Sequence, residues 1–88
     1  MPEAQVEIIN KAGLHARAAS KLAELCASFG SSIQIGHEKM VDGKSILSLM
    51  MLAAVKGTTV TIITEGDDAD EALNAIIELI NNRFDESE

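Results

Sequence analysis

The feature that most restricts the fold of this chain is the alternation between two spacings of its apolar residues. In some segments apolar and polar residues alternate or β-branched residues gather, which is typical of a β-strand. In others an apolar residue recurs every third or fourth position, which is typical of an amphipathic helix. The order is strand, helix, strand, strand, helix, strand, helix, over residues 5–9, 16–29, 32–36, 38–41, 45–55, 58–64 and 69–84. Because each helix has an apolar stripe to bury, we predict an α+β fold with the helices on one face of a mainly antiparallel sheet.

The length of the chain allows one core. Its 88 residues are expected to form a single domain spanning residues 1–88. With 47% hydrophobic and 24% charged residues, the composition is that of a folded globular protein. Since the chain contains two Phe and neither Trp nor Tyr, its core must be built from Ile, Leu, Val, Met and Ala.

Several residues mark the ends of the predicted helices. Gly30 suits the C-terminal stop of the first helix, and Lys56 with Gly57 suits the end of the second. Asp68, followed three positions later by Glu71, has the spacing of a capping box and predicts the start of the last helix.

Net charge and cysteine content restrict the classes of partner that the protein can bind and the cellular compartment that suits it. A net charge of −7 argues against binding to nucleic acid or to an anionic membrane surface, because both need Lys and Arg in number. The single cysteine, Cys26, cannot form an internal disulfide, and a free thiol fits a reducing compartment. We recognise no signal peptide, and the longest apolar-rich stretch, residues 46–55, is too short to span a membrane. We therefore expect a cytoplasmic protein.

His15 is the strongest candidate for chemistry. The sequence has no Cys/His pair at zinc spacing, no glycine-rich phosphate loop and no nucleophile elbow, so we expect neither a metal nor a cofactor. His15 lies just before a helix start, where the first N–H groups are unpaired and the helix dipole is positive. The N–H groups of Ala16 and Arg17 can hold a phosphoryl group attached to His15, and the Arg17 guanidinium can donate to the same oxygens. Gly13 permits the sharp turn that leaves the ring exposed.

Spacing alone leaves two interpretations open at each helix start. His15 either carries a phosphoryl group or is an ordinary N-terminal cap at the surface, with Arg17 a solvated charge. Ser45 stands where the second helix should begin, and physical chemistry favours an N-cap there. The functional interpretation is that Ser45 is phosphorylated, since a helix N-terminus tolerates a dianion.

The second helical segment has more apolar residues than one buried face can use. If Leu49 and Leu52 point inward, Ile46, Leu47 and Met50 stay at least partly exposed. Such a surface is typical of a partner-binding site, and methionine adapts to several partners. The other interpretation is a short helix that is buried on most sides.

Two motifs, Gly13-Leu14-His15-Ala16-Arg17 and Lys44-Ser45-Ile46, resemble those of the HPr family of histidine-containing phosphocarriers and its nitrogen-branch relatives called NPr. The similarity extends over residues 6–84 and includes the predicted order of elements. It implies an open-faced β-sandwich of HPr type, in which a four-stranded antiparallel sheet carries three helices on one face.

The resemblance also implies a function. His15 would accept a phosphoryl group on Nδ1 from phosphorylated enzyme I, with Arg17 assisting, and would pass it to an enzyme IIA-type protein. Ser45 matches the family's regulatory serine, the target of a dedicated kinase in some bacteria. The family's hydrophobic docking patch corresponds here to Ile46, Leu47 and Met50. Such a protein is a relay and not a turnover enzyme, and we expect a monomer.

Ala18 departs from the family pattern, in which proline commonly follows the arginine. Alanine keeps the helix but lacks the pre-set backbone of proline, so we expect a somewhat looser site that is still active. The alternative function is a purely regulatory interaction protein, acting through the surface of residues 46–50 without phosphotransfer. A sheet-based RNA reader is disfavoured, since it would need basic and aromatic residues.

Overall fold

In the computed structural model, which describes residues 2–86, four antiparallel strands form one sheet in the order β1-β4-β2-β3. The strands are β1 (Glu3–Glu7), β2 (Ser32–Gly36), β3 (Met40–Asp42) and β4 (Thr59–Glu65). The central strand β4 pairs with β1 and β2, and the short strand β3 pairs with β2.

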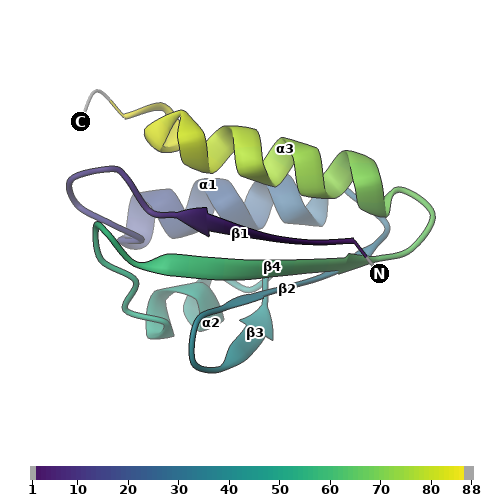
Figure 1. The fold of residues 1–88 in the computed structure, drawn as a ribbon, viewed down its shortest axis with the longest axis horizontal. Coiled ribbons are helices and arrows are strands. Elements are labelled where there is room, and N and C mark those ends of the chain that lie inside the picture. The colour runs from purple at the N-terminus through teal and green to yellow at the C-terminus, as the bar shows by residue number, and fades with distance from the viewer. Residues whose placement is uncertain (1, 87–88) are drawn as a thin grey trace.

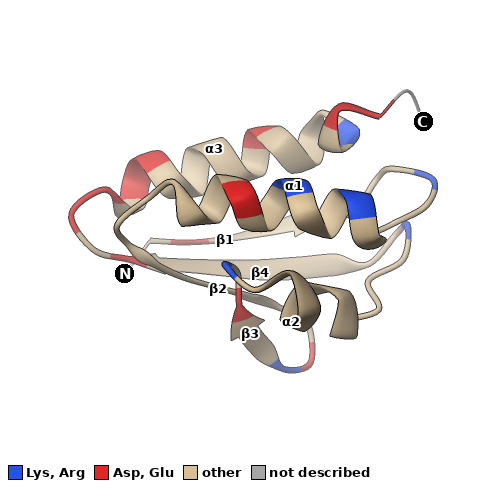
Figure 2. Ribbon diagram, turned by 180° about the vertical axis from the view of Figure 1, so that it is seen from behind, with Lys and Arg blue, Asp and Glu red and all other residues tan. Residues whose placement is uncertain are grey.

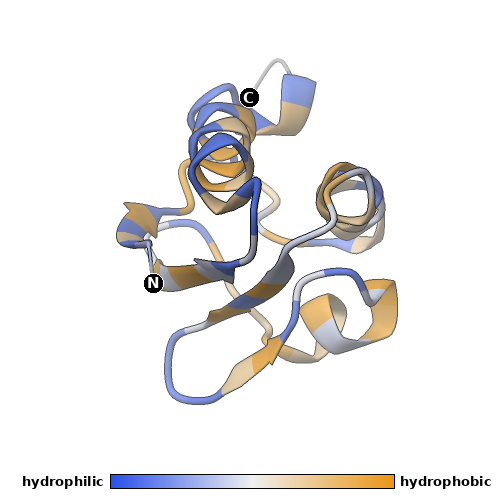
Figure 3. Ribbon diagram, turned by 90° about the vertical axis from the view of Figure 1, so that its right-hand side faces the viewer, coloured by the Kyte–Doolittle hydropathy of each residue, from blue (hydrophilic) through white to orange (hydrophobic). Residues whose placement is uncertain are grey.

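Within the same residues, three helices cover one face of this sheet. They are α1 (Ala16–Ala27), α2 (Ile46–Met51) and α3 (Ala69–Asn81), and a short 3₁₀ turn, η1 (Arg83–Asp85), follows α3. Figure 1 shows α1 and α3 running along the strands, and Figure 3 shows the helices on one side of the sheet with the other side uncovered. The predicted α+β fold and element order are confirmed.

The core between the sheet and the helices follows the predicted periodicities. In β4, Val60, Ile62 and Thr64 are buried, while the residues between them are more exposed. Thr64 is the polar member of this row, and its hydroxyl donates a hydrogen bond of 2.9 Å to the carbonyl oxygen of Ala69. Because this polar group has its partner, Thr64 can be buried without a large desolvation cost.

The second helix is shorter than predicted. It ends at Met51 and not at residue 55, because Leu52 closes the helix and Ala53 adopts a left-handed backbone with φ 52°. The predicted stop signal at Gly57, where φ is 94°, therefore ends the following loop and not the helix.

Asp68 does not form the predicted capping box. It occupies the N-cap position of α3, but its side chain makes no capping hydrogen bond. Its carboxylate instead accepts hydrogen bonds from the N–H groups of Gly30 (3.0 Å) and Ser31 (2.9 Å) and from the Ser31 hydroxyl. Gly30 serves this link and does not end α1, which stops at Ala27 with Ser28 as a right-handed C-cap.

Smaller differences lie at other element ends. Strand β1 begins and ends earlier than the predicted residues 5–9, and β3 begins after the predicted residue 38. The last helix stops short of the predicted residue 84, because a left-handed turn follows it. The turn residues have φ angles of 57°, 55° and 63° and are Arg83, Phe84 and Asp85.

Candidate functional site

The loop before α1 is fixed by a close approach between two backbones. The N–H of Leu14 donates a hydrogen bond of 2.8 Å to the carbonyl oxygen of Ala54, in the loop after α2. Gly13 has φ 69°, and a Cβ added to it would lie 2.6 Å from the same oxygen. Only glycine fits this position without movement of the backbone, and the turn delivers His15 to the start of α1.

His15 is the N-cap residue of α1. Its backbone is extended, with φ −82° and ψ −178°, and its carbonyl oxygen accepts a hydrogen bond of 2.8 Å from the N–H of Ala19. Its ring nitrogen Nδ1 accepts a hydrogen bond from the N–H of Arg17 at 3.3 Å. One ring nitrogen therefore faces the unpaired N–H groups of the helix start. The geometry that makes His15 an N-cap is the same geometry that a phosphoryl-carrying histidine would need at this position.

The other ring nitrogen contacts a residue that the sequence did not point to. His15 Nε2 lies 2.5 Å from Oε2 of Glu86, which is 71 positions further along the chain. The other carboxylate oxygen of Glu86, Oε1, accepts a hydrogen bond of 3.1 Å from Asn10 Nδ2, which also donates to the carbonyl oxygen of Gly13 at 2.7 Å. Figures 1 and 2 show the acidic C-terminal segment at the end of the molecule where α1 begins.

Glu86 is a carboxylate at neutral pH. Partial burial alone would raise its pKa, but hydrogen bonds from Asn10 and His15, together with the positive charge of Arg17, lower the pKa of Glu86 below its ordinary value. A carboxylate can only accept a hydrogen bond, so it holds the proton of the neutral ring on Nε2. The lone pair of Nδ1 is then left facing the N-terminus of α1, where attached negative charge is stabilised.

Arg17 contributes to this site through its backbone. Its side chain is exposed, and the guanidinium has no hydrogen bond or ion pair with another residue of the range 2–86. The N–H of Ala16, at the first helical position, has no acceptor within the helix. Ala18, in the same turn, is fully buried in the core.

Ser45 is an N-cap, as physical chemistry favours. Its hydroxyl oxygen accepts a hydrogen bond of 3.2 Å from the N–H of Ser48, and its backbone is extended. The side chain is half-buried at the start of α2.

The exposed side of α2 is apolar and lies next to the loop that positions His15. Leu49 and Leu52 are buried, and the predicted exposed residues are 45% (Ile46), 69% (Leu47) and 41% (Met50) accessible. Met51 and Val55 are also exposed, which we did not predict from this dense run of apolar residues. The apolar surface of α2 and its following loop therefore consists of Ile46, Leu47, Met50, Met51 and Val55.

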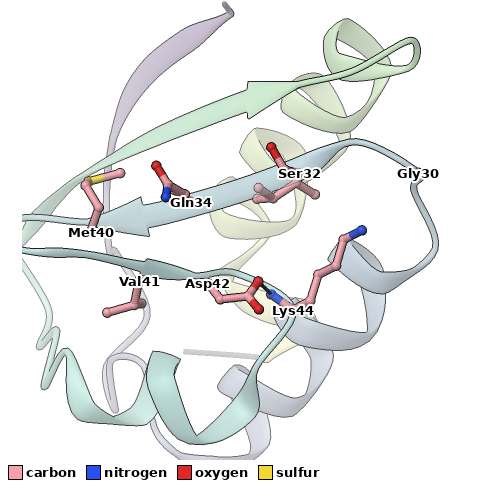
Figure 4. A pocket seen from close by; sticks show the side chains of 8 residues that line it. Gly30, Ser32, Gln34, Met40, Val41, Asp42 and Lys44 are labelled. Carbon is pink, nitrogen blue, oxygen red and sulfur yellow. Dashed lines mark hydrogen bonds between the residues drawn. The ribbon is translucent and has the colours of Figure 1, made fainter.

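A separate hollow of about 400 Å³ lies beside β2 and β3 (Figure 4). It is lined by Ser32 and Gln34 on one strand and by Met40 and Asp42 on the other, and it contains none of the predicted site residues. Residues 2–86 include no cluster of three or more His, Cys, Asp or Glu side chains suited to a metal ion. They also include no helix that is long and apolar enough to cross a membrane.

Comparison with known proteins points to one family. The family model described as the PTS HPr component phosphorylation site matches residues 2–82. The phosphocarrier protein HPr of Pseudomonas aeruginosa is 54% identical over the whole of both chains. The phosphocarrier protein NPr of Shewanella violacea is 49% identical over 97% of this chain and 94% of its own. Crystalline HPr-C-His from Thermoanaerobacter tengcongensis covers all of both chains with a TM-score of 0.96 and 39% identity.

Proposed function

The chain belongs to the HPr family of phosphocarrier proteins of the phosphotransferase system, and we propose that His15 is the residue that carries its phosphoryl group. The observation that carries the proposal is the position of Nδ1, which faces the first N–H groups of α1 and accepts from one of them at 3.3 Å. The purely regulatory alternative is not favoured, because the relatives are phosphocarriers.

The chemistry is the transfer of one phosphoryl group to a neutral imidazole. The Nδ1 lone pair forms the new N–P bond, while the bond between phosphorus and the donor breaks and its electron pair stays with the donor. The N–H of Arg17 then turns from Nδ1 to a phosphoryl oxygen, and the N–H of Ala16 and the Arg17 guanidinium supply further donors. Each protein molecule is thus a substrate and a product of the relay.

The partners follow from the place of the family in the phosphotransferase system. Phosphorylated enzyme I is the proposed donor, and an enzyme IIA-type protein is the proposed acceptor. Both would dock on the apolar surface of α2, whose methionines suit two different partners in turn. In this proposal the whole chain, residues 1–88, acts in the cytoplasm as one monomeric carrier domain.

The test is phosphorylation by phosphoenolpyruvate and the cognate enzyme I, followed by intact-mass spectrometry. We expect one added phosphoryl group that acid removes, and we expect none in His15→Ala. His37→Ala is the matched control, because His37 is the other histidine of the chain and should leave the modification intact. An acid-labile phosphoryl group that persists in His15→Ala would exclude His15 as the carrier.

A further inference from the structure

Residues 84–86 are tied to α1 by contacts that place Glu86 beside His15. Phe84 is fully buried, and the left-handed turn around it brings the chain back against α1. The ammonium group of Lys21 donates a hydrogen bond of 3.1 Å to the carbonyl oxygen of Phe84 and lies 3.8 Å from the carboxylate of Asp85. Glu86 is therefore delivered to the site by a packed segment.

The Glu86 carboxylate is itself held at both oxygens. One oxygen contacts His15 Nε2, and the other accepts from Asn10, whose side chain is fully buried. The Glu86 side chain is 16% exposed, while His15 is 33% exposed. Glu86, the less exposed of the two, thus holds the more exposed His15. The imidazole ring is fixed at both nitrogens, at Nε2 by Glu86 and at Nδ1 by the N–H of Arg17.

From this arrangement we infer that Glu86, held by Asn10, is a positioning residue for phosphoryl transfer at His15; the inference rests on the proposed function. When Nδ1 bonds to phosphorus, the proton on Nε2 stays in place and the imidazole ring becomes positively charged. Glu86 accepts a hydrogen bond from the Nε2–H group and faces the positive charge of the phosphorylated ring. It therefore stabilises the phosphorylated ring more than the free ring. It also keeps the neutral ring in the tautomer whose Nδ1 lone pair is available.

Two charged side chains act on the site around the His15 ring, those of Glu86 and Arg17. Glu86 faces Nε2 from the segment after η1, and Arg17 lies in the first turn of α1. Asp85, next to Glu86, pairs with Lys21. The effect of Glu86 can therefore be separated from that of a general change in charge by a distant control.

The test compares Glu86→Gln and Glu86→Ala with Glu65→Gln, which removes the same charge at the far end of β4. In the Glu86 variants, the kcat for phosphorylation by enzyme I should fall by about three- to tenfold. The KM should change little, because Glu86 is not part of the apolar docking surface. In ¹⁵N NMR spectra of the unphosphorylated protein at about pH 9, where imidazole is neutral, the native ring should carry its proton on Nε2. Glu86→Ala should shift the two nitrogen signals toward a mixture of tautomers. Glu65→Gln should match the native protein in both measurements.

The outcomes separate the two proposals. Native rates and native ring signals in both Glu86 variants would overturn the positioning role, even where His15→Ala confirms the carrier. A lower thermal midpoint with unchanged ring signals would also overturn it, since Glu86 would then only stabilise the fold. Retention of the acid-labile phosphoryl group in His15→Ala would instead refute the proposed function, whatever the Glu86 variants show.

Discussion

Gly13 combines two constraints that no side chain can meet. Its φ of 69° is left-handed, and an added Cβ would lie 2.6 Å from the Ala54 carbonyl oxygen and 2.9 Å from Val55 Cα. We expect Gly13→Ala to lower the free energy of unfolding by about 2–4 kcal/mol, the sum of backbone strain and overpacking. It should also slow phosphorylation of His15, because the turn that positions the ring must move. Urea denaturation and the phosphorylation assay measure the two effects.

Gly57 provides the matched control for that substitution. Its φ of 94° is also left-handed, but an added Cβ would meet no atom within 4 Å. Gly57→Ala should therefore show the backbone cost alone, about 1 kcal/mol, and leave phosphorylation unchanged. Equal losses of stability in the two variants would show that the close approach to Ala54 does not restrict Gly13.

Single residues differ in how far the sequence could point to them. His15 could be chosen as a candidate because its neighbours in the chain, Gly13 and Arg17, form the turn and the helix start around it. Glu86 and Asn10 could not, because their link to His15 depends on a fold that brings residues 71 positions apart into contact. Asparagine is also an ordinary turn residue, and no pattern in the neighbouring sequence indicates that the amide of Asn10 is buried.

Asp68 joins two elements, the start of α3 and the loop that leads into β2. Three hydrogen bonds, first that from the Ser31 hydroxyl and then those from the N–H groups of Gly30 and Ser31, favour the carboxylate and lower the pKa of Asp68. Because the folded pKa lies below the unfolded one, the resulting stability is fully present above about pH 4 and is lost as the pH falls through the folded pKa.

We therefore expect Asp68→Asn to lower the thermal midpoint at neutral pH, since an amide group cannot accept all three hydrogen bonds. The difference from the native protein should shrink as the pH falls from about 4, where the carboxyl of the unfolded chain takes up a proton, through the lower folded pKa of Asp68. Thermal unfolding followed by circular dichroism between about pH 8 and pH 3 measures this difference. Asp67→Asn, at an exposed neighbouring position, controls for the loss of charge. A difference that is constant across this range would contradict the role of the Asp68 charge.

Helices and strands that bury one face could be predicted from the sequence, but the residues at which they end could not. The alternation in residues 58–64 located β4 to within a residue, because one-sided burial leaves a period-two pattern. The end of α2 was wrong because a tertiary hydrogen bond, from Leu14 to Ala54, captures the chain after Leu52. Asp68 failed as a cap for the same reason, since donors from a distant loop took its carboxylate. Helix propensity and local spacing contain neither interaction.

At the scale of the whole molecule, the fold places His15 and the apolar surface of α2 on neighbouring segments. The hydrogen bond from Leu14 to Ala54 ties the start of α1 to the loop after α2, and α1 packs against α2. A partner that docks at His15, as we propose, would therefore also cover the apolar surface of α2. Ser45 begins this helix, next to the exposed Ile46 and Leu47.

A negative charge at Ser45 should therefore weaken docking and leave the fold intact. We expect Ser45→Asp to raise the KM for phosphorylated enzyme I by roughly tenfold, because a carboxylate beside an apolar contact must lose its water when the partner binds. The thermal midpoint should change little, since aspartate is as good an N-cap as serine and a helix N-terminus favours negative charge. Ser32→Asp adds the same charge on an exposed position of β2 and should leave the KM unchanged. If Ser45→Asp accepts phosphate with native kinetics, the start of α2 is not part of the docking surface.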